Sequence, residues 1–208
     1  MVTLASYLSR NWLSMAHINQ QLDLLRQELS WAGKWGYNIL GPDFFPKLQW
    51  LYQDHTVNPY PDSGNRFIHE IGNNLSNSTH MGLCGVANVN DNHWVGIVIN
   101  LTECKIKFSD SLGGSGTELR AAIQWWIQIH TGFDFEDTDL NLTTQSDGVN
   151  CGLFALNAIK HFTYPDKKLL LRQSTSVAPY DEDRLLRFLS ISNQDLELVS
   201  LLLHYLLW

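Results

Sequence analysis

The sequence predicts an α+β fold in which helices pack on a small, mostly antiparallel sheet. Apolar residues recur at helical spacing near the start of the chain and again in its second half, whereas β-branched residues concentrate in the middle. Strands that follow one another between helices, without regular strand–helix alternation, favour this class over a doubly wound fold. Because 208 residues fit one medium-sized domain, we expect residues 1–208 to form a single domain.

The first predicted helix follows Ser14, a good N-cap residue, and runs to Gly33. Its apolar face is expected to consist of Ile18, Leu22, Leu25 and Leu29. Glycines and prolines interrupt the segment 35–78, which predicts short helices and loops there. One of these short helices is expected at Phe67–Ile71.

The central strands are predicted at 81–89, 94–101 and 105–109, which are rich in Val and Ile or alternate apolar with polar residues. The last two of these strands are close enough in sequence to form a hairpin. A glycine-rich loop follows, and the apolar spacing after it predicts a helix at 117–130. A short strand is expected at 139–144.

The last third of the chain is predicted to be mainly helical. One helix is expected at 151–162, and Pro165 prevents it from continuing. Acidic residues at 181–183 favour the start of another helix, through Leu189, because negative charge interacts well with a helix N-terminus. A C-terminal helix is expected at 195–207.

The composition argues against a nucleic-acid or membrane partner. The chain holds 14 Lys and Arg against 21 Asp and Glu, which gives a formal net charge of −7. No dense basic run is present that could neutralise a series of phosphates. The longest apolar run, at 198–208, is too short to span a bilayer.

Three cysteines at wide spacings predict a reducing, intracellular environment rather than a disulfide framework. The first ten residues also lack the layout of a secretory signal peptide. No CxxC pair or HExxH motif indicates a metal site, and no glycine-rich phosphate loop indicates a nucleotide site. We therefore expect neither a metal nor a cofactor.

Cys151 is the strongest candidate nucleophile among the cysteines. It lies at the predicted start of a helix, where the pKa of a thiol can fall from about 8.5 to roughly 3.5–7.5. Gly152 beside it has no side chain to obstruct a substrate carbonyl. Cys84 and Cys104 lie in or beside predicted strands instead. Taken alone, Cys151 has a structural alternative, since burial as an inert thiol is the commonest fate of a free cysteine.

A cysteine nucleophile works best with an adjacent histidine that a third group orients. His93 precedes one strand of the predicted hairpin and Asp110 follows the other, so antiparallel pairing brings the two side chains together. Gln145, six residues before Cys151, is the candidate donor to the oxyanion of a tetrahedral intermediate. The structural alternatives are a surface polar pair for His93 and Asp110, and a turn residue for Gln145.

Four short blocks of the sequence resemble the ubiquitin-like-specific (ULP/SENP) proteases. The blocks are Asn11-Trp12-Leu13-Ser14, His93-Trp94, Asp110-Ser111-Leu112 and the segment from Gln145 to Cys151-Gly152. Each block is weak by itself, but the four occur in the order of the family and with a family-like separation of His and Asp. The resemblance runs from about Trp12 to Leu189, so we expect a ULP/SENP-like catalytic domain.

The resemblance implies a papain-like cysteine protease fold that cleaves after the Gly-Gly terminus of SUMO or a related modifier. In the roles that it implies, Cys151 is the nucleophile, His93 is the general base and then acid, and Asp110 orients His93. Gln145 donates to the oxyanion. The resemblance implies no metal, and it suggests a nuclear or cytoplasmic location.

The resemblance also implies that Trp94 and Trp12 form a tunnel for the two glycines, since flat indoles over an extended backbone leave no room for a Cβ atom. Burial in the core is the alternative for both rings, because tryptophan is mostly buried. The tryptophans that we expect in the core are Trp31, Trp35, Trp50, Trp125 and Trp126.

Two positions depart from the family pattern. Asn150 stands where the family has an Asp before the nucleophile, and Met15 replaces an Asp that in relatives faces a basic patch on SUMO. Three other functions stay open on the sequence alone. They are modifier binding without cleavage, acyl transfer as in related acetyltransferases, and proteolysis directed at ubiquitin, a NEDD-type modifier or a viral-type polyprotein.

Overall fold

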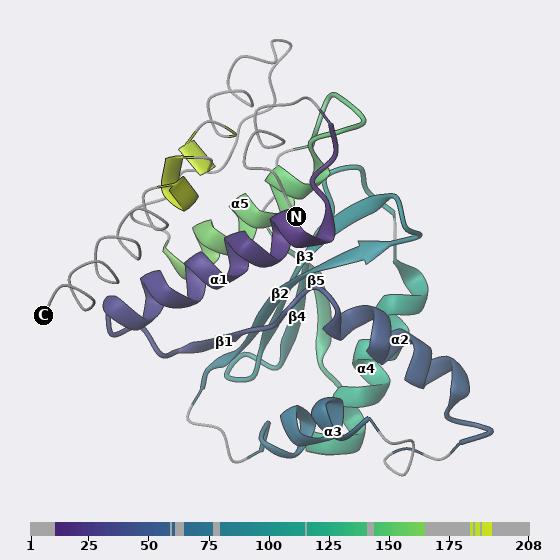
Figure 1. Cartoon of the computed structure of the whole chain (residues 1–208). Coiled ribbons are helices and arrows are strands. Elements are labelled where there is room, and N and C mark those ends of the chain that lie inside the picture. Colours follow the sequence, from purple (N-terminus) through teal and green to yellow (C-terminus); the bar gives the residue numbers. More distant parts are fainter. Residues whose placement is uncertain are drawn as a thin grey trace, which may run out of the picture.

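A five-stranded sheet runs through the molecule, with helices on both of its faces (Figure 1). The computed structural model describes residues 11–58, 60, 65–76, 80–114, 116–140, 144–164, 184, 186, 187 and 189–192. The strands lie in the sheet in the same order as in the sequence, from β1 to β5. The predicted α+β class is therefore confirmed.

The centre of the sheet is antiparallel, as predicted. β2 (Gly82–Val89) pairs with β3 (His93–Asn100), and β3 pairs with β4 (Lys105–Ser109). The turn between β2 and β3 places Asn90 at φ 55° and Asp91 at φ 57°. Asn and Asp tolerate this left-handed region better than other side chains, and turns of this kind match the twist of a hairpin. The turn sets where β3 begins, and so positions the histidine that opens it.

Both edges of the sheet are parallel pairings, which the sequence did not predict. β1 (Tyr37–Ile39) pairs with β2, and β5 (Glu136–Asp139) pairs with β4. Parallel neighbours need a crossover connection. Helices α2 (Phe44–Asp54) and α3 (Arg66–Asn73) lie in the first crossover, and α4 (Thr117–Thr131) lies in the second.

The strand expected at 139–144 is misplaced, because β5 ends at Asp139. Its acidic side chains are balanced by basic neighbours: Glu136 lies 3.4 Å from the Nζ atom of Lys105, and Asp137 pairs with Arg120. An acidic strand lacks the apolar alternation on which strand prediction depends, so the pattern did not reveal it.

One face of the sheet is covered by α1 (Met15–Trp31) and α5 (Cys151–Thr163), which confirm the helices predicted after Ser14 and at 151–162. Ser14 is the N-cap of α1, and its backbone N–H donates to Nδ1 of His17 at 3.0 Å. The predicted apolar face of α1 is buried against this layer, with Ile18, Leu22, Leu25 and Leu29 in the core. α5 packs directly on β3 of the sheet.

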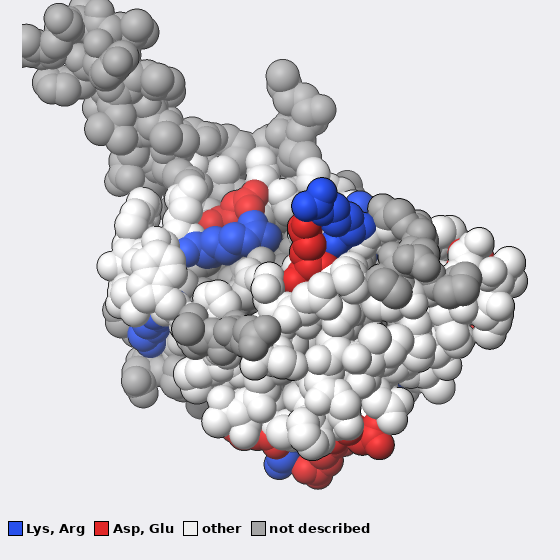
Figure 2. All heavy atoms as spheres, turned by 90° about the horizontal axis from the view of Figure 1, so that it is seen from below, with Lys and Arg blue, Asp and Glu red and all other residues white. Residues whose placement is uncertain are grey.

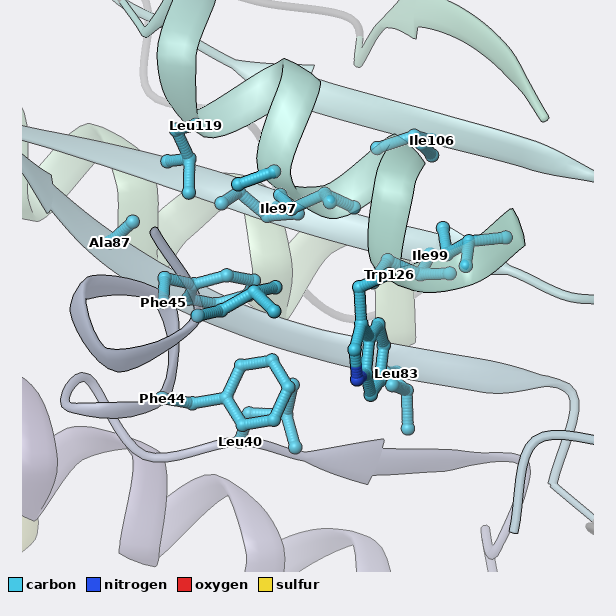
Figure 3. Packing of buried hydrophobic residues seen from close by; sticks show 14 of the residues in the cluster. Leu40, Phe44, Phe45, Leu83, Ala87, Ile97, Ile99, Ile106, Leu119 and Trp126 are labelled. Atoms are coloured by element: carbon cyan, nitrogen blue, oxygen red, sulfur yellow. The ribbon is translucent and has the colours of Figure 1, made fainter. Parts of the chain in front are cut away.

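Helices α2 and α4 pack on the other face, and α3 packs against both of them. Figure 3 shows Phe44, Phe45 and Trp126 among buried residues of the sheet. The rings of Phe44 and Trp126 meet edge to face, with 5.4 Å between their centroids. Pro46 lies in the first turn of α2, where a missing backbone N–H costs no helical hydrogen bond. The proline therefore does not interrupt this helix.

Three of the tryptophans expected in the core are exposed instead. Trp31, Trp35 and Trp50 are 76%, 63% and 53% exposed. Trp31 follows Leu29 by two residues on α1, which turns it away from the buried stripe. Trp126 is fully buried and Trp125 is partly buried, as expected.

Part of the C-terminal prediction can be compared with the structure. Residues 184, 186, 187 and 189–192 are helical and appear in yellow beside α1 (Figure 1). The helix expected at 195–207 lies outside the described residues. Within the described part of the chain, no helix combines the length and hydropathy that crossing a bilayer would require.

The charged residues of one face are mostly arranged as neighbours of opposite sign. Figure 2 shows this face as largely uncharged, with the blue basic atoms beside red acidic ones. This face therefore lacks a concentrated basic patch of the kind that holds a phosphate backbone.

Candidate active site

The predicted nucleophile, Cys151, is the first residue of α5 and is 1% exposed. The sulfur therefore lies at the N-terminus of a helix, where the partial positive charge of the helix dipole is concentrated. A Cβ atom on Gly152 would lie 3.2 Å from Cδ1 of Trp94 and 3.3 Å from Cβ of Leu13. Close packing around the helix start therefore explains why residue 152 is a glycine. The sequence did not indicate this reason.

His93 and Asp110 are in direct contact, as the hairpin predicted. Nε2 of His93 lies 2.7 Å from Oδ1 of Asp110, and both side chains are buried. The same Oδ1 atom accepts the backbone N–H groups of Leu112 and Gly113, each at 3.0 Å. The carboxylate is therefore held in one orientation, and it in turn fixes the ring of His93.

The environment of His93 favours its protonated form. Burial lowers the pKa of His93, but the hydrogen bond and charge of Asp110, together with the interaction with Cys151, raise it to about 9. Nδ1 of His93 is buried and makes no hydrogen bond with a described residue. Because Nε2 is bonded to Asp110, Nδ1 is the ring nitrogen that remains available to Cys151.

Gln145 is buried and held at both ends of its amide. Its Oε1 atom accepts the hydroxyl of Ser111 at 2.6 Å, and its Nε2 atom donates to the carbonyl of Asp147 at 2.6 Å. One N–H of the amide remains without a partner among the described residues. Ser111 thereby fixes which way the amide points. The sequence analysis quoted Ser111 within a motif but gave it no role.

The two tryptophans of the predicted tunnel both lie against the start of α5. Trp94 is 3% exposed and donates from Nε1 to the carbonyl of Leu13 at 2.8 Å. Trp12 is 42% exposed and donates to the carbonyl of Gly148 at 2.7 Å. The structure thus attaches Trp12 to the turn before Cys151, whereas most of Trp94 is covered.

The two departures from the family pattern lie in different surroundings. Asn150 is buried, and its side chain contacts both Asp147 and Arg184. Met15 is 46% exposed at the start of α1. The sequence did not indicate a role for Arg184, since nothing local marks a single arginine in an acidic, leucine-rich segment.

Neither a metal-binding cluster nor the cavity beside α5 forms part of this site among the described residues. Among the described residues, no group of three His, Cys, Asp or Glu side chains could hold a metal ion. A cavity of about 500 Å³ lies beside the other end of α5, lined in part by Lys107, His161 and Phe162. It is remote from Cys151 along the helix and does not belong to the candidate site.

Comparison with known proteins places the chain in a family. It matches the Ulp1 protease family, C-terminal catalytic domain, over residues 11–170, which is most of its length. Curated protein sequences give no match. Three solved structures illustrate the similarity in fold.

The C-terminal Ulp1 protease domain, solved in complex with Smt3, the yeast ortholog of SUMO, gives a TM-score of 0.64 at 15% identity over 92% of this chain and 81% of that one. The Ulp1-like SUMO protease catalytic domain of Chaetomium thermophilum gives 0.61 at 14% identity, over 87% and 73%. The Xanthomonas campestris effector XopD, bound to ubiquitin, gives 0.52 at 15% identity, over 85% and 91%.

These similarities confirm the predicted papain-like cysteine protease fold. The family match, which covers most of the chain, also confirms the predicted resemblance and the thiol-dependent protease activity. The chain belongs to the Ulp1 protease family, a family of cysteine peptidases.

Proposed function

We propose that this protease cleaves the bond after the C-terminal Gly-Gly of a ubiquitin-like modifier, and that the modifier is SUMO. The observation that carries the proposal is the position of His93, which is bonded to Asp110 and lies beside Cys151 at the start of α5. Such a site would act on precursor tails and on modifiers linked to a substrate lysine, because both present a carbonyl after the two glycines.

In the proposed reaction, the Cys151 thiolate attacks the carbonyl carbon of the terminal glycine. A C–S bond forms and the carbonyl electrons move onto oxygen, giving a tetrahedral intermediate. The imidazolium of His93 then protonates the leaving nitrogen as the C–N bond breaks. Water, deprotonated by the neutral imidazole, attacks the thioester and releases the modifier with a free carboxylate. No metal or cofactor takes part.

Two groups support the negative oxygen of the intermediate in this proposal. The unpaired N–H of Gln145 donates to the oxyanion, in an orientation held by Ser111. The N-terminus of α5 adds partial positive charge at the same place. Both are arranged before the substrate arrives, so little reorganisation is needed when charge develops.

Selection of glycine follows from the two indoles. Trp12 is half-exposed and fixed by its bond to Gly148, and Trp94 is fixed by its bond to Leu13. Rings that cannot rotate away exclude a Cβ atom from the chain that passes beside them. A substrate that ends in larger residues would clash there.

The choice of SUMO rests on the resemblance to SUMO proteases. A structure of the Ulp1 protease domain was solved with Smt3, but one of XopD was solved with ubiquitin. Ubiquitin is therefore the second candidate, and a test must include it.

The experiment offers wild-type protein and Cys151→Ala three fusions, in which SUMO, a NEDD-type modifier or ubiquitin is joined through Gly-Gly to a reporter peptide. We expect cleavage of the SUMO fusion by wild type and none by Cys151→Ala. A SUMO fusion in which the last Gly is replaced by Ala should react at least about tenfold more slowly, because in the proposed arrangement the added methyl would clash with the fixed indoles.

Each part of the proposal can fail separately. Cleavage by Cys151→Ala would remove the nucleophile, and faster cleavage of ubiquitin or the NEDD-type modifier would remove SUMO. An equal rate with the Gly-to-Ala fusion would contradict the role of the tryptophans. No cleavage of any fusion would contradict the proposal as a whole.

A further inference from the structure

Arg184 is a buried arginine that reaches the candidate site from the C-terminal part of the chain. It is 2% exposed and lies outside the segment 11–170 that matches the family. Its guanidinium donates twice to Oδ1 of Asn150, from Nε at 3.2 Å and from Nη2 at 2.9 Å. Nη2 also donates to the carbonyl of Asn11 at 2.9 Å.

Asn150 and Asn11, which both accept hydrogen bonds from Arg184, are neighbours of the two parts of the site. Asn150 directly precedes Cys151, and Asn11 directly precedes Trp12. One guanidinium thus links the segment that carries the half-exposed indole to the turn that leads into the nucleophile. The bond from Trp12 to the carbonyl of Gly148 is a second link between these same segments.

Asn150 also connects Arg184 to the carboxylate of Asp147. Its Nδ2 atom donates to Oδ2 of Asp147 at 2.9 Å, while Oδ1 of Asp147 accepts the backbone N–H groups of Val149 and Asn150 at 2.8 and 2.9 Å. Burial works against the charged form, but these hydrogen bonds and the charge of Arg184 lower the pKa of Asp147 below its usual value. The turn before Cys151 is therefore held between the carboxylate of Asp147 and the guanidinium of Arg184.

The departure from the family pattern at position 150 is suited to this arrangement. An asparagine side chain can donate to a carboxylate and accept from a guanidinium at the same time, whereas an ionised aspartate can only accept. Asp at position 150 would also bring a second negative charge against Asp147. The amide is thus the side chain that connects Asp147 to Arg184 without repulsion.

We infer that Arg184 is a positioning residue for the reaction, which clamps the Trp12 segment to the turn before Cys151 and so sets the distance between the glycine-selecting indole and the sulfur. The substrate in this inference depends on the proposed function, whereas the expected effect on the geometry of the thiol does not. A displacement of about 1 Å at a reacting group can cost about 100-fold in rate, so a clamp of this kind matters for turnover.

Arg187 provides a matched control. It is also buried, at 6% exposed, and lies three residues further along the same helical stretch. Its Nη1 atom donates to Oε1 of Gln21 on α1 at 3.2 Å. Replacing either arginine removes a buried cation from the same stretch, but Arg184 bonds Asn150 in the turn before the nucleophile whereas Arg187 bonds Gln21 on α1.

The experiment compares wild type, Arg184→Met, Arg184→Lys and Arg187→Met in the full chain. Three quantities are measured: the melting temperature, kcat and KM on the fusion that wild type cleaves, and the pH dependence of Cys151 alkylation by iodoacetamide, with Cys104→Ala as the background. Alkylation needs no modifier, so it reports on the thiol even if the proposed substrate is wrong.

For Arg184→Met we expect kcat/KM to fall at least about tenfold below that of Arg187→Met, with a higher KM and an altered pH profile of alkylation. Arg184→Lys should recover part of the loss, because an ammonium can replace one of the two contacts. Activity losses that follow the melting temperature equally in both methionine variants would overturn the inference, and so would an unchanged pH profile in Arg184→Met.

If Arg184→Met does not fold, Trp12→Phe tests the same clamp from its other side. This change keeps an aromatic ring but removes the N–H that bonds Gly148. We expect KM to rise with the fold intact. An unchanged KM in Trp12→Phe would contradict the clamp independently of Arg184.

Discussion

The contact between His93 and Asp110 controls the charge state of the proposed catalytic pair. Burial lowers the pKa of His93, but Asp110 and Cys151 raise it from 6.5 to about 9. The imidazole therefore stays protonated up to about pH 9, through the whole neutral range. Activity should fall as the pH rises through about 9, where the imidazolium loses its proton.

Asp110→Asn tests this directly, because it removes the charge but keeps the shape of the side chain. The pKa of His93 should fall, so the alkaline limit of kcat/KM should move to lower pH, and the rate at neutral pH should drop by about 100-fold or more. The pH–rate profiles of wild type and variant measure both effects. An alkaline limit that stays in place would show that Asp110 does not set the charge of His93.

The same shift links the His93–Asp110 pair to stability. A histidine whose pKa is raised on folding stabilises the fold fully below its unfolded value of 6.5, and this contribution is lost as the pH rises through about 9. The free energy of unfolding should therefore differ more between wild type and Asp110→Asn at about pH 6 than at about pH 10. Urea denaturation at the two pH values measures the difference. A gap that is equal at both values would contradict the linkage.

Ser111 is expected to act through Gln145. Ser111→Ala removes the hydroxyl that bonds Oε1 of Gln145, so the amide can turn its oxygen toward the substrate. We predict that kcat falls about tenfold while KM changes little, because the lost contact matters mainly when the oxyanion forms. Gln145→Ala should lose at least as much. Equal activity of Ser111→Ala and wild type would mean that the amide is oriented by other contacts.

The sequence located the residues that lie at the ends of predicted elements. His93 opens a strand, Asp110 follows a strand, and Cys151 opens a helix, so local periodicity and short motifs were sufficient to find them. The contact of Ser111 with Gln145 joins positions 34 residues apart, and Arg184 contacts the site across a still longer separation. No local pattern reveals such contacts, since they depend on the tertiary fold.

The start of α5 is packed too closely to accept a larger residue beside the nucleophile. In Gly152→Ala, the new Cβ would meet Trp94 at 3.2 Å and both Ile18 and Leu13 at 3.3 Å. Alanine gains up to about 1 kcal/mol over glycine in a helix, but overpacking costs about 1–3 kcal/mol, and three elements would have to move together. We predict a net loss of about 1 kcal/mol or more in denaturant unfolding.

Gly148→Ala is the matched control for this substitution. A Cβ atom at Gly148 meets nothing within 4 Å, so its stability should stay within about 0.5 kcal/mol of wild type. A Gly152→Ala variant that is as stable as Gly148→Ala would show that the helix start is packed less tightly than the contacts indicate.

The elements found from the sequence are those with a clear repeat of apolar residues. α1, α4, α5 and the three central strands were predicted nearly to their ends. β1 was missed because it has only three residues. α2 lies in the segment where short helices were expected, but its bounds were not predicted, because proline in its first turn resembles a helix breaker. The exposed tryptophans were misplaced because a residue type indicates average burial, whereas the helical phase determines which way each side chain points.

The fold as a whole brings five distant segments to one end of the sheet. Trp12, His93, Asp110, Cys151 and Arg184 belong to five different parts of the chain. The antiparallel hairpin could be foreseen from the sequence, but the parallel edges and the layering of helices on both faces could not, because they depend on long crossovers.

The described helical residues 184, 186, 187 and 189–192 are an integral part of this arrangement. Arg184 bonds the turn before Cys151, Arg187 bonds Gln21, and Ile191 is 4% exposed in the core shared with α1 and α5. We predict that a chain ending at Tyr164 loses about 3 kcal/mol or more in stability, together with most of its activity. Thermal unfolding and kcat/KM check this. Unchanged values would mean that the segment 165–208 is dispensable.

Covalent capture tests most directly whether Cys151 is the nucleophile for a Gly-Gly terminus. Cys104 is exposed whereas Cys84 and Cys151 are buried, so exposure alone would direct an electrophile to Cys104. SUMO that carries an electrophile in place of its C-terminal carboxylate is incubated with the protein, and the modified peptide is identified by mass. We expect one adduct, on Cys151, that is absent in Cys151→Ala and unchanged in Cys104→Ala. Labelling of Cys104 instead, or no adduct at all, would contradict the proposed site.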